Sequence, residues 1–140
     1  MKKLDDSLGY LINRAAVSMR WALEEKLSEH DLTAPQWAVL SRLMENNGQS
    51  LTAIGKSLHA DKPTVTGVVD RLEQKGFVKK SRDLEDRRII RVYLTTKGKN
   101  VSSRLPELAE RVNQDAIQGM NEEEVKKLKK QLLKIQNNLG

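Results

Sequence analysis

The 140-residue sequence contains no cysteine. This absence excludes disulfides, thiolate catalysis, cysteine-based redox sensing and zinc sites built from cysteine. No apolar run approaches the roughly 20 residues that a transmembrane helix needs. The first residues, MKKLDDSLGYL, lack the continuous apolar region of a signal peptide. We therefore expect a soluble, cytoplasmic protein with no membrane partner.

Catalytic and metal-binding patterns are also missing. The only two histidines, His30 and His59, fall in different connecting segments. The sequence has no nucleophile elbow, no phosphate-binding glycine loop and no ligand cluster with metal spacing. Paired carboxylates such as Asp5 and Asp6 are explained by favourable charge at helix starts. We expect neither an enzyme nor a bound cofactor or metal.

The net charge of +6 is unevenly distributed. Residues 1–49 carry a net charge of −1, residues 50–100 carry +6 and residues 101–140 carry +1. A local basic excess is typical of proteins that bind a polyanion, although a solvated basic surface produces the same pattern. Charge alone therefore leaves nucleic acid as one of two explanations.

The basic segment is centred on residues 61–76, DKPTVTGVVDRLEQKG, which we predict to be a recognition helix. Asp61 suits the N-cap, Pro63 the first turn, and Gly76 the position after the end. One face carries an apolar stripe at helical spacing, formed by Val65, Val68, Val69 and Leu72. The other face is small, polar and basic, so a DNA groove can approach its backbone closely. We expect this face, which carries Thr64, Thr66, Gly67, Asp70, Arg71 and Lys75, to lie in a DNA groove.

Two helices are predicted before the recognition helix. Thr33 and Gln36 form a capping box for a helix over residues 34–46. Ser50 or Thr52 caps a second helix over residues 51–58. A turn of about three residues then leads to residues 62–75, which gives the dimensions of a helix-turn-helix.

After Gly76 the pattern changes to alternation, which predicts two strands at residues 77–81 and 88–94. A β-hairpin over residues 77–95, directly after a helix-turn-helix, is a wing. Its tip is expected to contact the minor groove through Arg82, Arg87 and Arg88, with Asp86 bracing one arginine. Further phosphate contacts are expected from Lys56, Lys79 and Lys80.

Helical patterns also flank the winged segment. Residues 4–29 carry a long apolar stripe, residues 97–118 form a helix that Pro106 should bend or break, and a capping box at Asn121 opens a last helix. The simplest use of the first and last stripes is a shared dimer interface. Two recognition helices about 34 Å apart would then read a palindrome.

In these features the chain resembles the MarR family of winged-helix transcriptional regulators, including its SlyA-like members. The resemblance rests on LTAPQWAVLSRL at 32–43, the helix pair at 50–83, DRR at 86–88 and LTTKG at 94–98. It implies a mainly α (α+β) fold with winged helix-turn-helix residues 32–95 and a helical dimerisation region formed by residues 1–31 and 96–140.

The resemblance also implies function. It predicts a homodimer that binds pseudo-palindromic operator DNA, usually as a repressor, with Arg88 in the minor groove. It also implies that the start of the recognition helix meets base edges in the major groove, through Lys62, Pro63, Thr64, Thr66 and Gly67. Arg71 is then expected to contact phosphate or to support the helix. Family members often bind a small phenolic or aromatic acid between the dimerisation helices and the winged domain, which would release the DNA. Nothing in this sequence identifies such a ligand or its binding residues.

A second function remains open from the residues alone. Winged folds also bind protein or RNA, and fold does not determine function. The basic wing tip beside a helix face of small residues favours duplex DNA. Strong salt dependence of binding to duplex DNA would discriminate the two.

Overall fold

The computed structural model describes residues 3–140. It is mainly helical, with one antiparallel pair of strands. The elements, in chain order, are α1 (Leu8–Leu27), α2 (Ala34–Glu45), α3 (Leu51–Leu58), α4 (Lys62–Gln74), β1 (Val78–Arg82), β2 (Ile90–Leu94), α5 (Thr96–Ser102), α6 (Leu105–Ala116) and α7 (Glu122–Leu139), with 3-10 turns at Leu4–Asp6 and Ser28–His30. This architecture confirms the predicted fold class, a winged helix-turn-helix between flanking helices.

Side-chain caps start the helices of the winged part. Thr33 Oγ1 accepts a hydrogen bond from the Gln36 N–H at 3.3 Å, and Gln36 Oε1 accepts one from the Thr33 N–H at 3.2 Å. Asp61 Oδ1 accepts from the backbone of the third residue of α4 at 2.8 Å. Ser50 caps α3 and Thr95 caps α5. Each cap pairs a donor that the helix itself leaves free.

The hydrophobic core lies where α2, α3 and α4 meet the wing, α5 and the ends of α1 and α6. Its fully buried apolar side chains include Leu27, Leu40, Leu43, Ile54, Val69, Leu72, Val92 and Leu105. The stripe predicted on α4 supplies Val65, Val69 and Leu72 to this core, with Val68 packed at its edge. Burying these side chains fixes which face of α4 stays outside.

A short turn at His59 joins α3 to α4. His59 adopts the left-handed conformation, with φ of +53°, and the N–H of Ala60 bonds to the carbonyl of Gly55 at 2.9 Å. A Cβ on Gly55 would lie 3.0 Å from the Ala60 oxygen and 3.4 Å from a Val65 methyl. The glycine therefore allows the two helices of the helix-turn-helix to approach closely.

The wing differs in detail from its prediction. Both strands begin later than expected, and Arg88 and Ile89 belong to the tip. The tip closes there because the Asp83 N–H bonds to the Ile89 carbonyl and the Ile89 N–H bonds to the Asp86 carbonyl. The loop before α3 also pairs with β2, through a bridge between Ser50 and Arg91. The sequence pattern did not predict this third segment.

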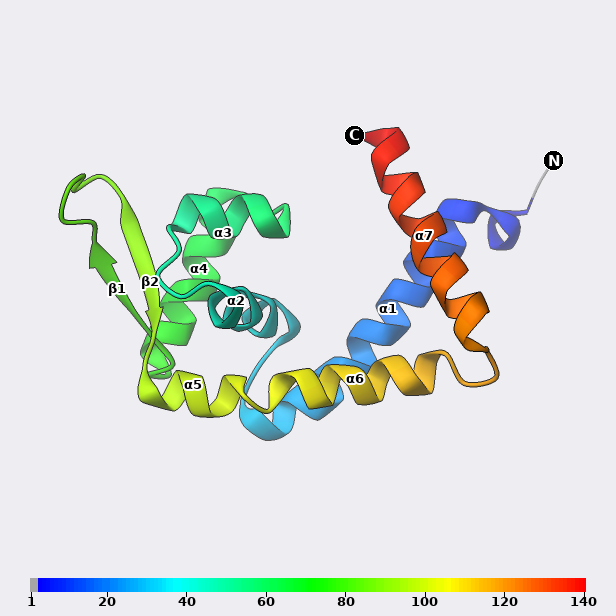
Figure 1. The fold of residues 1–140 in the computed structure, drawn as a ribbon, viewed down its shortest axis with the longest axis horizontal. Coiled ribbons are helices and arrows are strands. Elements are labelled where there is room, and N and C mark those ends of the chain that lie inside the picture. The colour runs from blue at the N-terminus through cyan, green and yellow to red at the C-terminus, as the bar shows by residue number, and fades with distance from the viewer. Residues whose placement is uncertain (1–2) are drawn as a thin grey trace.

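The long helix predicted over residues 97–118 is broken, as Pro106 suggested. α5 ends at Ser102 and α6 begins at Leu105, so Pro106 is the second residue of α6, where its missing N–H costs no hydrogen bond. Figure 1 shows the wing at one end of the molecule and α7, with the start of α1, at the other. α5 and α6 connect the two ends, and α6 packs against α1. Among the described helices, none combines the length and apolar character needed to cross a membrane.

Candidate nucleic-acid interface

The outward face of α4 carries the side chains expected to bind DNA. Lys62, Pro63, Thr64 and Arg71 are exposed, while Thr66 and Gly67 are partly exposed. These six residues lie opposite the buried stripe, so packing of the core directs them to solvent. The structure thus gathers all six on one side of a rigid, capped helix.

Gly67 leaves an open space in the middle of this face. A Cβ built there would meet only the Arg71 Nη1 atom, at 3.8 Å. Its φ is not positive, so the backbone does not require glycine either. The residue is therefore a gap in the helix surface that neither packing nor conformation explains.

At the wing tip, Asp86 holds Arg88. Its carboxylate accepts hydrogen bonds from Arg88 Nε and Nη2, both at 3.1 Å, and from the Arg88 backbone N–H at 3.1 Å. These bonds from Arg88 lower the pKa of Asp86 below its usual range. The Arg88 side chain is nevertheless 91% exposed. A bidentate pair of this kind orients a guanidinium without covering it.

The other two arginines of the wing lie close to this pair. Arg87 belongs to the tip, whereas Arg82, expected at the tip, is the last residue of β1 and pairs with Ile90. Arg82 Nη1 donates to the carbonyl of Arg87 at 2.8 Å, which ties the two arms of the hairpin together. Arg87 and Arg82 are both exposed. All three arginines named from the sequence therefore remain available to a ligand.

A hollow joins the wing to the start of α4. Lys62 of α4 and Arg88 of the wing both line it, together with Ser50 and Thr52 at the start of α3. Sequence reasoning treated Ser50 and Thr52 only as helix caps. Their position in the same hollow shows that the start of α3 belongs to this surface. The sequence alone does not reveal this, because the hollow forms only where α3, α4 and the wing pack together.

The three lysines expected at phosphates have different surroundings. Lys56 is exposed on α3, and Lys79 is exposed on the wing face that also carries Tyr93. Lys80 instead points toward α4, where its Nζ lies 2.5 Å from Asp70 Oδ1 and 3.6 Å from Glu73 Oε1. The hydrogen bond to Asp70 raises the pKa of Lys80.

A further ion pair, which sequence reasoning missed, braces the wing where β1 runs into the tip. Arg91 Nε donates to Asp83 Oδ1 at 2.7 Å, and Arg91 Nη1 donates to the Gly48 carbonyl at 3.1 Å. Asp83 also accepts the backbone N–H groups of Glu85 and Asp86. The hydrogen bond from Arg91 is the main cause that lowers the pKa of Asp83.

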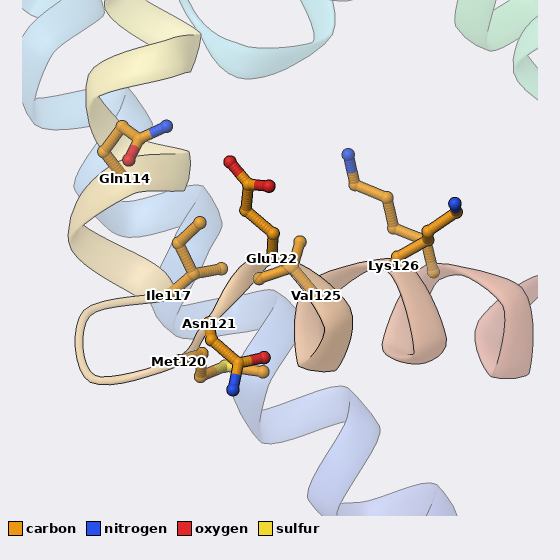
Figure 2. Close-up of a pocket in the computed structure, with 8 residues that line it drawn as sticks. Gln114, Ile117, Met120, Asn121, Glu122, Val125 and Lys126 are labelled. Carbon is orange, nitrogen blue, oxygen red and sulfur yellow. The ribbon is translucent and has the colours of Figure 1, made fainter.

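Another hollow lies far from this surface, at the elbow between α6 and α7. Figure 2 shows Ile117, Met120 and Val125 beside the polar side chains of Gln114 and Glu122. None of these was named as a site residue from the sequence. In the described part of the chain, no group of three or more metal-ligating side chains comes together.

Comparison with known proteins identifies the family of this fold. The family model described as the MarR family matches residues 32–90. The HTH-type transcriptional regulator TtmR of Methylorubrum extorquens is 36% identical over 104 residues, which are 74% of this chain and 53% of TtmR. The HTH-type transcriptional repressor IacR of Pseudomonas putida is 31% identical over 117 residues, which are 84% of this chain and 70% of IacR. The chain thus spans about half the length of the first relative.

Solved structures agree with these relatives. A mutant of MarR from E. coli, complexed with operator DNA, superposes with a TM-score of 0.86 at 29% identity, and the match covers 91% of this chain and 92% of that one. A basic winged helix-turn-helix with flanking helices defines a class of transcriptional regulators. Within that class, this chain belongs to the MarR family. Members of that family are regulators, which confirms the expectation that the chain is not an enzyme.

Proposed function

We propose that the protein is a dimeric, sequence-specific DNA-binding regulator that represses transcription from pseudo-palindromic operators. The observation that carries this proposal is the continuous surface that runs from the outward face of α4, through the hollow, to Arg88. A helix can enter the major groove while a thin, basic hairpin reaches the adjacent minor groove.

The surroundings of each residue support a division of roles. Thr64 and Thr66 offer hydroxyls and methyls to base edges, and Gly67 allows close approach. Lys62, Arg71, Lys56 and Lys79 supply phosphate contacts, which position the protein without specifying sequence. In the wing, Arg88 enters the minor groove in the orientation that Asp86 sets, with Arg82 and Arg87 beside it.

Exposed apolar side chains support the homodimer. α7 has no buried residue, although its stripe repeats at heptad spacing. Large apolar side chains remain exposed on α1 and α7, namely Leu8, Leu11, Leu128, Leu133 and Leu139. A second copy would cover this end of the molecule, which includes the elbow hollow of Figure 2. We accordingly propose residues 1–31 and 96–140 as the dimerisation region and residues 32–95 as the DNA-binding domain.

The repressor role has support from the name of IacR, a transcriptional repressor. Release from DNA by a small aromatic or phenolic acid rests on the family resemblance, and we include it in the proposal on that basis.

Selection from random duplex DNA tests the proposal. The purified protein is incubated with the library at about 0.15 M salt, which suppresses non-specific binding. We expect enrichment of a palindrome whose half-sites lie about one helical turn, roughly 34 Å, apart. Binding without an enriched motif would contradict sequence-specific reading. No binding to duplex DNA would favour the alternative, a winged-helix module for protein or RNA.

A further inference from the structure

Lys80 connects the wing to the recognition helix at three points. Its ammonium group lies 2.5 Å from Asp70 Oδ1 and 3.6 Å from Glu73 Oε1. Its backbone N–H also donates to Glu73 Oε2 at 3.2 Å. Both carboxylates belong to α4, and Lys80 belongs to β1. Lys80 thus links the two elements proposed to enter neighbouring grooves, in addition to their packing in the core.

Asp70 is on the DNA-facing half of α4. It follows Thr66 by four residues, which places the two side chains one above the other on the helix. The Asp70 side chain is 45% exposed. An unpaired carboxylate at this place would repel the phosphates beside the groove. Near a protein surface, solvent weakens the repulsion between two like charges but does not abolish it. The ammonium group of Lys80 offsets that charge.

Lys80 is itself poorly placed to reach DNA. Its side chain is 29% exposed, and its ammonium group is paired with the carboxylates of both Asp70 and Glu73. The neighbouring Lys79 pairs with Tyr93 in the strand register and is exposed on the other face of the hairpin. Of these two adjacent lysines, only Lys79 is free to contact phosphate, whereas Lys80 is paired with α4.

The geometry points to Lys80 as a positioning residue, which neutralises Asp70 and Glu73 and holds α4 against the wing, and not as a ligand of phosphate. This inference rests on the proposed function, and it replaces the phosphate contact expected of Lys80 from the sequence. It concerns how the DNA-binding face is kept free of negative charge.

A double-mutant cycle tests the inference. The variants are Lys80→Met, Asp70→Asn and the double variant, with Lys79→Met and Lys79→Met/Asp70→Asn as the matched set. Each is titrated with the selected operator duplex at several salt concentrations. We expect Lys80→Met to weaken binding about tenfold, the scale of one exposed like charge. Asp70→Asn should restore affinity to Lys80→Met but not to Lys79→Met.

The salt dependence of binding is a second, independent measurement, because partial unfolding would not change it in this way. Loss of one phosphate contact makes the negative slope of log affinity against log salt shallower by about 0.9. A positioning role predicts the wild-type slope in the Lys80→Met/Asp70→Asn variant. A slope that stays reduced in that variant, or rescue of both lysine variants alike, would overturn the inference. Lys80→Arg, which keeps the charge, should bind like wild type, and a large loss there would also count against it.

The proposed function and this inference fail in different ways. If the wild-type protein selects no duplex, the proposed function fails and the inference fails with it. If the wild type binds its operator and Lys80→Met binds equally well, only the inference is overturned.

Discussion

Gly67 sits inside α4, where glycine destabilises a helix by about 1 kcal/mol relative to alanine. The space in front of it is open, so the fold does not require this cost. We predict that Gly67→Ala raises the free energy of unfolding by up to about 1 kcal/mol, as measured by urea denaturation. The same methyl group should weaken operator binding by roughly 1–3 kcal/mol, the scale of one specific contact. If the wild type and Gly67→Ala bound the operator with equal affinity, DNA would not approach this position closely.

Gly98 is the matched control, because its glycine has a structural cause. A Cβ there would lie 1.9 Å from the carbonyl oxygen of Phe77, so Gly98→Ala should lower stability. Helical periodicity was enough to place Gly67 on the predicted DNA-facing surface, because the apolar stripe defines the opposite, buried face. It could not distinguish the two glycines energetically, because the contact of Gly98 with Phe77 joins separate elements.

Among the elements, the wing is stabilised by the ion pair between Arg91 and Asp83, where β1 runs into the tip. Hydrogen bonding to Arg91 keeps the pKa of Asp83 below its ordinary value of 3.8. Because the folded pKa is depressed, the stabilisation is complete above the unfolded pKa and is lost as the pH falls through the folded pKa. We predict that Arg91→Ala raises the pKa of Asp83 toward 3.8, measured from its carboxyl carbon shift by NMR. The wing amides of Glu85 and Asp86 should lose protection in the same variant.

Lys79→Ala is the control for this prediction. It also removes a positive charge from the hairpin, but it leaves the hydrogen bond between Arg91 and Asp83 in place. A similar pKa change in both variants would mean that general charge, and not the Arg91 hydrogen bond, sets the pKa. The contacts of Arg91 with Asp83 and Gly48 could not be predicted from the sequence. Alternation predicted a hairpin, but the end of pairing depends on hydrogen bonds within the tip, and Arg91 reaches Gly48 across 43 residues of sequence. Local patterns contain no information about such a contact.

At the scale of the whole molecule, α5 and α6 connect the wing to the end that bears α7 (Figure 1). The distance between two recognition helices in a dimer would therefore depend on how the two copies pack through α1 and α7. The partly buried residues of the α7 stripe include Val125, Leu132 and Ile135. Their heptad spacing is typical of helices that pack against one another. This arrangement makes a single substitution on α7 informative about both assembly and DNA binding.

We predict that Leu132→Glu separates the dimer, because a carboxylate in an apolar interface is costly to desolvate. Sedimentation equilibrium should give twice the chain mass of 15.9 kDa for the wild type and the single chain mass for the variant. Asn137→Glu adds the same charge to the exposed opposite face of α7 and should remain dimeric. Melting temperature should rise with protein concentration for the wild type and the control, since association stabilises the folded chain. Leu132→Glu should also lose its preference for the palindrome over a single half-site, because two recognition helices would no longer be held together. A monomeric wild type, or a dimeric Leu132→Glu variant with unchanged preference, would contradict an interface through α7.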